Sequence, residues 1–293
     1  MSFITHWHPL VTFFFYVNML IISMCFDQPI IILGAVVGSI GWLYFLLSRN
    51  EWVKNLVFYL VLALIIMVTN PLFSHKGQTV LFFLNGNAVT KEAILYGAAM
   101  GGKMAAVFAY SRCFAEVFRI NQFLYLFQKI SPKLALLLSM ALGFVPKLKR
   151  QAKSVSDMQR TMGMYSKHSY MDQVLSKIRV FDSLITWSLE QGVTTADSMN
   201  ARGYGQGRRS SFTIYRFGGA DRVRLFWLVV IAGIFYVGAM ADAFAFSYYP
   251  TIMNLEINPR QWIYYICFVS LAAMPICLEI KEKMKWNVLQ SKM

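Results

Sequence analysis

Long apolar runs separated by short polar connections dominate both ends of this chain. A helix needs about 20 consecutive apolar residues to cross the hydrocarbon core of a bilayer. Runs near that length cover residues 9–26, 28–47, 55–73, 93–115, 225–247 and 260–280. The pattern therefore predicts an all-α polytopic membrane protein with about six transmembrane helices. The first run follows His6, Trp7 and His8 instead of a charged region and a cleavage site, so we expect a retained span.

Between the fourth and fifth runs the pattern changes to that of amphipathic helices. Ser131-Pro132 is a typical helix start, with Ser as the N-cap and Pro at the first helical position. Apolar residues then recur at three-to-four spacing on one face, which predicts a helix ending near Gly163. These residues are Leu134, Leu138, Ala141, Val145, Leu148, Ala152, Val155 and Met162.

A second amphipathic helix is predicted to continue to Ala201. Its apolar face carries Met171, Val174, Leu175, Ile178, Phe181, Ile185 and Leu189. Gly203, Gly205 and Gly207 then stop the helix. We therefore expect three parts: transmembrane helices in 1–130, long amphipathic helices in 131–224, and transmembrane helices with a basic tail in 225–293.

The distribution of positive charge predicts the orientation in the membrane. The chain has a formal net charge of +14. All but five of its 28 Lys and Arg residues fall in 48–54, 116–224 and 281–293. Cytoplasmic loops of membrane proteins are enriched in these residues, so the N-terminus and 116–224 are predicted to be cytoplasmic. The excess charge of 131–224 favours either anionic lipid headgroups or an acidic protein partner. Nucleic acid is not expected, because no binding motif accompanies the charge.

Two arginines stand out because each lies at a predicted helix end. Arg202 lies between Ala201 and Gly203, and Arg160 lies between Gln159 and Thr161. An arginine at a helix tip can enter a narrow groove and pair with a carboxylate through two hydrogen bonds. Alternatively, a cation near a helix C-terminus simply complements the helix dipole.

No sequence motif for catalysis, metal binding or cofactor binding is convincing. Residues 97–104 imitate the start of a phosphate-binding loop, but Met104 stands where Ser or Thr should ligate magnesium. Gly97 and Gly101 instead suggest a small-residue face that lets another membrane helix approach closely. Lys103 is the deepest charge in the apolar runs and is a candidate for a partner contact or an internal ion pair. We therefore expect a chain that is not an enzyme and binds no cofactor or metal.

Several segments resemble the transmembrane (T) component of energy-coupling factor transporters, the EcfT/CbiQ family. The matching segments are 70–77, 81–87, Phe144-Val145-Pro146 and Asp197 to Tyr204. The last is the most specific, since it matches the second of two short X-Arg-X motifs by which such proteins engage their ATPases. Gln159-Arg160-Thr161 corresponds to the first motif, which is commonly Ala-Arg-Gly.

The resemblance implies a scaffold in an importer of a vitamin or a transition-metal ion in the bacterial cell membrane. Its implied partners are two ATP-binding-cassette (ABC) ATPase subunits, expected as a heterodimer, and a small membrane substrate-binding (S) component. ATP and magnesium would then bind to the ATPases. The segment 131–224 would then form cytoplasmic coupling helices, and its motifs around Arg160 and Arg202 would contact the ATPases. Gly97, Gly101 and Lys103 are candidates for contact with the S component.

Two other classes of function remain open from the residues alone. A secondary carrier would need ionisable groups in its spans, and these are mostly absent. A polytopic membrane enzyme would need a cluster of polar catalytic side chains at one membrane depth, and none is visible in the sequence.

Overall fold

The structure is a computed structural model that describes residues 7–74, 77–84, 87–163, 170–207, 215, 217–241, 244–253 and 259–290. His6 and four residues of the family-like segments, His75, Lys76, Asn85 and Gly86, lie outside the described residues. The chain forms two compact units. Met1–Phe123 and Tyr215–Met293 form the membrane unit, and Leu124–Ile214 forms the second unit, which we call the coupling unit.

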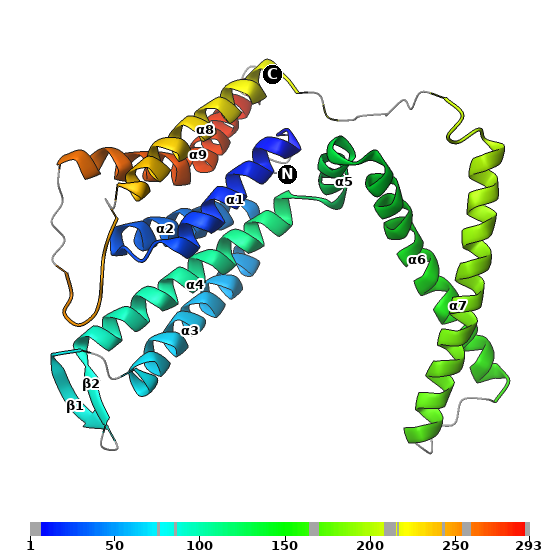
Figure 1. The fold of residues 1–293 in the computed structure, drawn as a ribbon, viewed down its shortest axis with the longest axis horizontal. Helices are drawn as coiled ribbons and strands as arrows, with labels where there is room; N and C mark the ends of the chain where they lie inside the picture. The colour runs from blue at the N-terminus through cyan, green and yellow to red at the C-terminus, as the bar shows by residue number, and fades with distance from the viewer. Residues whose placement is uncertain are drawn as a thin grey trace. The chain divides into compact units, whose positions relative to one another are not determined.

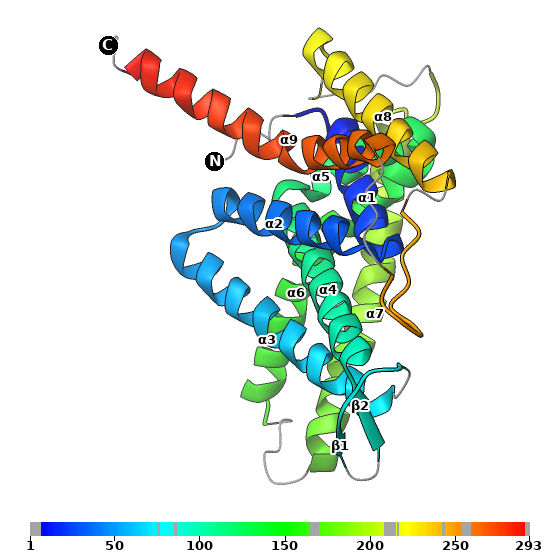
Figure 2. The same ribbon diagram turned by 90° about the vertical axis from the view of Figure 1, so that its left-hand side faces the viewer.

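Each of the six predicted apolar runs forms a helix of the membrane unit (Figures 1 and 2). The helices are α1 (Pro9–Cys25), α2 (Pro29–Leu46), α3 (Arg49–Phe73), α4 (Lys91–Val117), α8 (Gly219–Met240) and α9 (Pro259–Gln290). Among the described residues, all except α1 are long and apolar enough to cross a membrane. Helix α1 is apolar but has only 17 residues, about 25 Å at about 1.5 Å per residue. The predicted all-α polytopic fold is confirmed.

Helix α4 lies at the centre of the membrane unit, between α3 on one side and α1 and α2 on the other (Figure 1). Its alanines Ala105, Ala106 and Ala109 are buried, and their small side chains allow close approach. Helix α9 packs against both α2 and α8. By contrast, α3 buries little besides Tyr59 and Pro71 and leaves a broad apolar surface exposed, as expected for a helix that faces lipid.

The small-residue face predicted at Gly97 and Gly101 is in contact with α3 of the same chain. A Cβ atom at Gly101 would lie 2.6 Å from the carbonyl oxygen of Ala63, and one at Gly97 would lie 3.0 Å from that of Met67. Glycine at these positions therefore lets α3 and α4 meet backbone to backbone. A contact between these glycines and an S component stays a prediction, and it would require α3 to move away.

A β-hairpin connects α3 and α4 and was not predicted. Strands β1 (Val80–Leu84) and β2 (Asn87–Thr90) pair antiparallel, with Val80 opposite Thr90 and Phe83 opposite Ala88. The sequence does carry a signal for this element. An apolar run with high strand propensity precedes Asn-Gly, the dipeptide most typical of tight hairpin turns.

The coupling unit contains two long helices, α6 (Pro132–Thr161) and α7 (Tyr170–Ala201). The shorter α5 (Ile120–Ile130) begins in the membrane unit and leads into α6. Helix α6 starts as predicted, with Ser131 as the N-cap and Pro132 at the first position. The two long helices run in opposite directions and cross (Figure 1). The rings of Phe144 from α6 and Trp187 from α7 stack at 5.6 Å between centroids.

Candidate functional site

The C-terminus of α7 ends in a glycine cap that places Arg202 on the surface. Gly203 has a φ of +74°, a left-handed conformation that favours glycine. Its N–H donates to the carbonyl of Asn200 at 2.9 Å, and the N–H of Tyr204 donates to that of Met199 at 3.0 Å. These two bonds form a Schellman motif in which Arg202 is the cap residue. Ala201 and Arg202 are both exposed, as predicted for a helix tip.

The C-terminus of α6 also ends at a left-handed glycine, but its arginine is placed differently. Gly163 has a φ of +71°, and its N–H donates to the carbonyl of Arg160 at 3.1 Å. The cap residue is Met162, so Arg160 lies two residues before the cap, within the last turn. Both Arg160 and Thr161 are exposed. Each arginine therefore lies at an exposed helix end. Arg202 is the cap residue of its helix, whereas Arg160 lies two residues before the cap of its own.

Gln159 differs from its exposed neighbours because its side-chain oxygen is buried. The oxygen Oε1 has no hydrogen-bond partner within the described part of the chain. The residue lies on the face of α6 that packs toward α7, together with Val155, and both are partly buried. A change at Gln159 would thus act on the packing of α6 as well as on any partner.

The two arginine ends lie on opposite sides of the α6–α7 crossing (Figure 1). Arg160 is sixteen residues beyond Phe144, and Arg202 is fifteen residues beyond Trp187, on helices that run in opposite directions. At about 1.5 Å per residue, each arginine is roughly 22–24 Å from the stacked rings along its helix. The coupling unit therefore presents two separate basic helix ends.

Helix α7 has one face against α6 and an apolar face that points away from it. Buried or partly buried positions on the first face include Ser176, Val180, Leu184 and Trp187. The opposite face exposes a row of apolar side chains that are 44–68% exposed, which we call the α7 apolar stripe. It consists of Met171, Leu175, Ile178, Phe181, Ile185, Leu189 and Val193. A continuous apolar row this long on the surface is typical of an interaction site or of contact with lipid.

Lys103 forms an ion pair within the membrane unit. Its Nζ lies 2.5 Å from Oδ1 of Asp27, a residue in the connection between α1 and α2. Of the two alternatives predicted for Lys103, the structure contains the internal ion pair. The hydroxyl of Tyr248 donates to the backbone carbonyl of Asp27 at 2.9 Å. Burial, followed by the charge of Asp27 and the nearby Tyr96, raises the pKa of the Tyr248 phenol to about 12, so this donor stays protonated at neutral pH.

Within the described residues, the structure contains neither a phosphate-binding loop at 97–104 nor a cluster of metal-binding side chains. Residues 97–104 lie within the continuous helix α4, so their N–H groups are used in helical hydrogen bonds and cannot surround a phosphate. Across the described ranges, no group of three or more His, Cys, Asp or Glu side chains is arranged to hold a metal ion.

Comparison with protein families identifies the chain. The family model CbiQ, described as cobalt transport protein, matches residues 1–214. The chain belongs to the CbiQ family of cobalt transport proteins. A comparison with curated proteins found no match. CbiQ proteins are the T components of energy-coupling factor transporters, and the family is a transport component that is not itself catalytic.

The CbiQ match extends from α1 to the segment after α7, so it includes both arginine ends and the α7 apolar stripe. Helices α8 and α9 lie beyond it. Sequence reasoning missed Asp27, the partner of Lys103, because 76 residues separate the two. The only sequence signal for this pair is that Asp27 is an isolated acid beside an apolar run and that Lys103 is the deepest lysine within such a run.

Proposed function

We propose that this CbiQ-family chain is the coupling subunit of an ATP-driven importer in the cell membrane. In this proposal two cytoplasmic ABC ATPase subunits bind the arginine ends of α6 and α7. A membrane S component that captures a transition-metal ion or a vitamin contacts the α7 apolar stripe. The chain itself binds neither ATP nor substrate, and it transfers the ATP-driven movement of the ATPases to the S component.

The observation that carries this proposal is the exposed Arg202 at a capped helix end. The Schellman motif satisfies the backbone carbonyls of Met199 and Asn200, so the Arg202 guanidinium is not needed as a donor to them. A planar guanidinium on a rigid tip is suited to paired hydrogen bonds with a carboxylate in a groove. Two such ends, on opposite sides of one helix crossing, suit a partner made of two similar subunits.

The α7 apolar stripe supports the second half of the proposal. Because the stripe points away from α6, a partner can contact it without separating the two helices. Apolar contact is non-directional, so a partner can shift along such a surface with little change in free energy. When ATP brings the ATPase subunits together, the two arginine ends would move with them, and the angle between α6 and α7 would change.

The decisive experiment tests Arg202 against a matched arginine on the same helix. The complex is purified through a tag on this chain, and the ATPase subunits are quantified by mass spectrometry. Arg202→Ala should weaken ATPase binding by roughly 2–5 kcal/mol, as expected when one member of a buried charge pair is removed. Arg179→Ala removes the same charge from an exposed position in the middle of α7 and should leave the ATPases bound.

Either of two results would contradict the proposal. If Arg202→Ala retains both ATPases as fully as Arg179→Ala does, the helix end is not the docking site. If the unmodified chain purifies without any ABC ATPase, the chain is not a coupling subunit. Radiolabelled Co²⁺ is the first substrate to assay, because the family is described as a cobalt transport protein.

A further inference from the structure

The polypeptide passes between the membrane unit and the coupling unit twice. It leaves the membrane unit after α4, through residues 118–123, and it re-enters at Tyr215, followed by Phe217 and Gly218 before α8. These segments are nearly one hundred residues apart in sequence. Phe118 of the first segment nevertheless lies against Phe13, and Phe217 of the second lies against His8, while Arg224 in α8 lies over Trp7. We call Trp7, His8 and Phe13, at and just before the start of α1, the α1 anchor.

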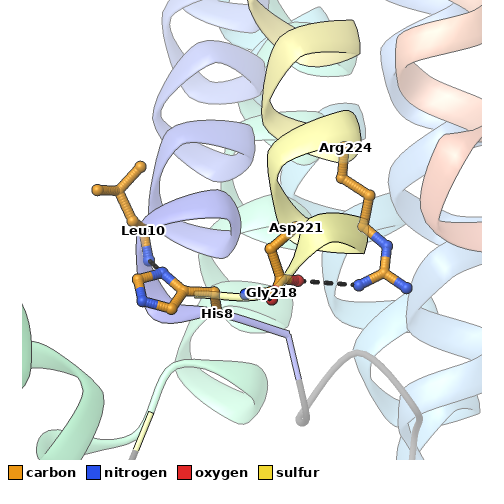
Figure 3. Close-up of polar contacts among 5 residues, drawn as sticks. All are labelled: His8, Leu10, Gly218, Asp221 and Arg224. Carbon is orange, nitrogen blue, oxygen red and sulfur yellow. Dashed lines mark hydrogen bonds and ion pairs between the residues drawn. The ribbon is translucent and has the colours of Figure 1, made fainter. Parts of the chain in front are cut away.

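On the return side, Arg224 attaches α8 to the α1 anchor. The guanidinium carbon lies 5.2 Å from the ring centroid of Trp7, within the range of a cation–π interaction. Its Nη1 donates to Oδ1 of Asp221 at 3.0 Å (Figure 3). Trp7 is only 1% exposed, and both charged side chains are largely buried. Partial burial strengthens both interactions by excluding water.

Asp221 extends this attachment to the N-cap of α8, three residues after the chain re-enters the membrane unit. Its second oxygen, Oδ2, accepts a hydrogen bond from the N–H of Gly218, the N-cap of α8, at 3.3 Å (Figure 3). Phe217 then meets the ring of His8 edge to face, at 4.8 Å between centroids. His8 is itself the N-cap of α1, because its Nδ1 accepts from the N–H of Leu10 at 3.3 Å.

On the exit side, an aromatic group holds the end of α4 against the same helix. The ring of Phe118, the cap residue of α4, stacks on Phe114 at 4.7 Å and lies 5.8 Å from Phe13. Immediately afterwards the N–H of Arg119 donates to the buried side chain of Gln122 at 3.3 Å. Both crossing points are thus held against α1 by side chains just before its first turn (Trp7 and His8) and in its second turn (Phe13).

We propose that the α1 anchor is the joint through which movement of the coupling unit reaches the membrane helices, with Arg224 as its positioning residue. This inference rests on the proposed coupling function. A movement of α6 and α7 can shift α4 and α8 only if the connecting segments are held firmly at their ends. Both ends are held on the same helix, α1. A movement of the coupling unit would therefore reach α1, α4 and α8 together.

The test compares Arg224→Ala with Arg222→Ala in the complete transporter, purified with its ATPase and S subunits and placed in proteoliposomes. Arg222 is two residues away, carries the same charge and is exposed. Radiolabelled Co²⁺ uptake is measured per ATP hydrolysed. Arg224→Ala should lower this ratio roughly three- to tenfold, the range expected for losing a partly buried cation–π contact. Arg222→Ala should leave the ratio unchanged, and Arg224→Lys, which keeps the charge, should give an intermediate value.

A ratio for Arg224→Ala equal to that for Arg222→Ala would overturn the proposal. A proportional loss of uptake and ATPase activity would also overturn it, because that result indicates only a less stable complex. Hydrogen exchange on the isolated chain in nanodiscs tests the joint without transport. Arg224→Ala should speed exchange both at residues 8–12 and at 217–222, and unchanged exchange at 8–12 contradicts the joint. If the wild-type complex shows no ATP-dependent Co²⁺ uptake, Co²⁺ is not its substrate. The hydrogen-exchange result then still tests whether the α1 anchor connects α1 with α8.

Discussion

At the scale of single residues, the Lys103–Asp27 pair is one of three ion pairs in the described part of the membrane unit. The two partners are not equivalent, because the Lys103 side chain is 14% exposed and that of Asp27 is 50% exposed. Removing a charge leaves its partner alone, and the cost depends on how well water can reach that partner. The pair therefore predicts unequal effects for its two substitutions.

We expect Asp27→Asn to destabilise the chain more than Lys103→Met does. In Asp27→Asn the mostly buried ammonium of Lys103 loses its partner, at a cost of about 1–3 kcal/mol. In Lys103→Met the remaining carboxylate of Asp27 is half exposed and can be hydrated, so the cost should be clearly smaller. Thermal unfolding of the chain in nanodiscs, followed by tryptophan fluorescence, measures this difference.

The double variant provides the control for this prediction. Asp27→Asn with Lys103→Met should resemble Lys103→Met alone, because no unpaired charge remains near α4. Equal losses for the two single variants, or a double variant as unstable as the sum of both, would show that the ion pair does not determine the stability of this region.

At the scale of elements, the sequence predicted where helices begin and end better than it predicted which helices pack against one another. Unbroken apolar runs identify spans because lipid leaves few other structures possible. Ser131-Pro132 and Gly203 mark helix ends because their effects are local. In the structure Ser131 occupies the N-cap position of α6, and Gly203 adopts the left-handed conformation after α7. The partner of Gly97 and Gly101 could not be predicted, since a small-residue face fits any close helix.

Helix α7 shows most clearly what the sequence could not decide. Its amphipathic period was correctly predicted, but the strongest apolar row is the exposed one, and a mixed face with Ser176 and Trp187 packs on α6. In a subunit that binds partner proteins, the most apolar face of a helix can contact a partner instead of the rest of its own chain. A single sequence contains no information about which face is used inside the chain and which outside.

Because the most apolar face of α7 is exposed, the α7 apolar stripe can be tested as a binding surface for the S component. Phe181→Gln combined with Leu189→Gln should reduce the amount of S component that purifies with the chain at least several-fold, because two large apolar contacts are lost. The ATPases should remain bound, since the arginine ends are unchanged. The readout is the ratio of S component to ATPase in the purified complex, determined by mass spectrometry.

A matched double variant on another face of α7 serves as the control. Ser183 and Thr194 are exposed, lie outside the stripe and hydrogen-bond only to the preceding turn in the contacts described. Ser183→Gln with Thr194→Gln should leave the complex intact. If both double variants lose the S component equally, α7 acts through its overall stability and the stripe is not the docking surface.

At the scale of the whole molecule, side-chain contacts show that the connections between the helices of the membrane unit lie at two ends of that unit. Tyr248, from the connection between α8 and α9, bonds to Asp27, and Tyr249 lies near both Ser74 and Tyr96. The connections that follow α1, α3 and α8 therefore meet at one end. Residues 7–8, 118 and 217 meet at the other, around the α1 anchor. This is the alternation expected for successive membrane crossings.

The charge bias predicts that the end with the α1 anchor faces the cytoplasm, and this orientation can be tested by labelling. In a variant whose four native cysteines are replaced by alanine, a membrane-impermeant maleimide should label Gln78→Cys, an exposed position in the connection after α3, in intact cells. It should label Ser154→Cys, an exposed position on α6, only after the membrane is opened. ATP is available only inside the cell, so the reverse pattern would place α6 and α7 beyond the reach of any cytoplasmic ATPase. That result would remove the physical basis for coupling at Arg160 and Arg202 together.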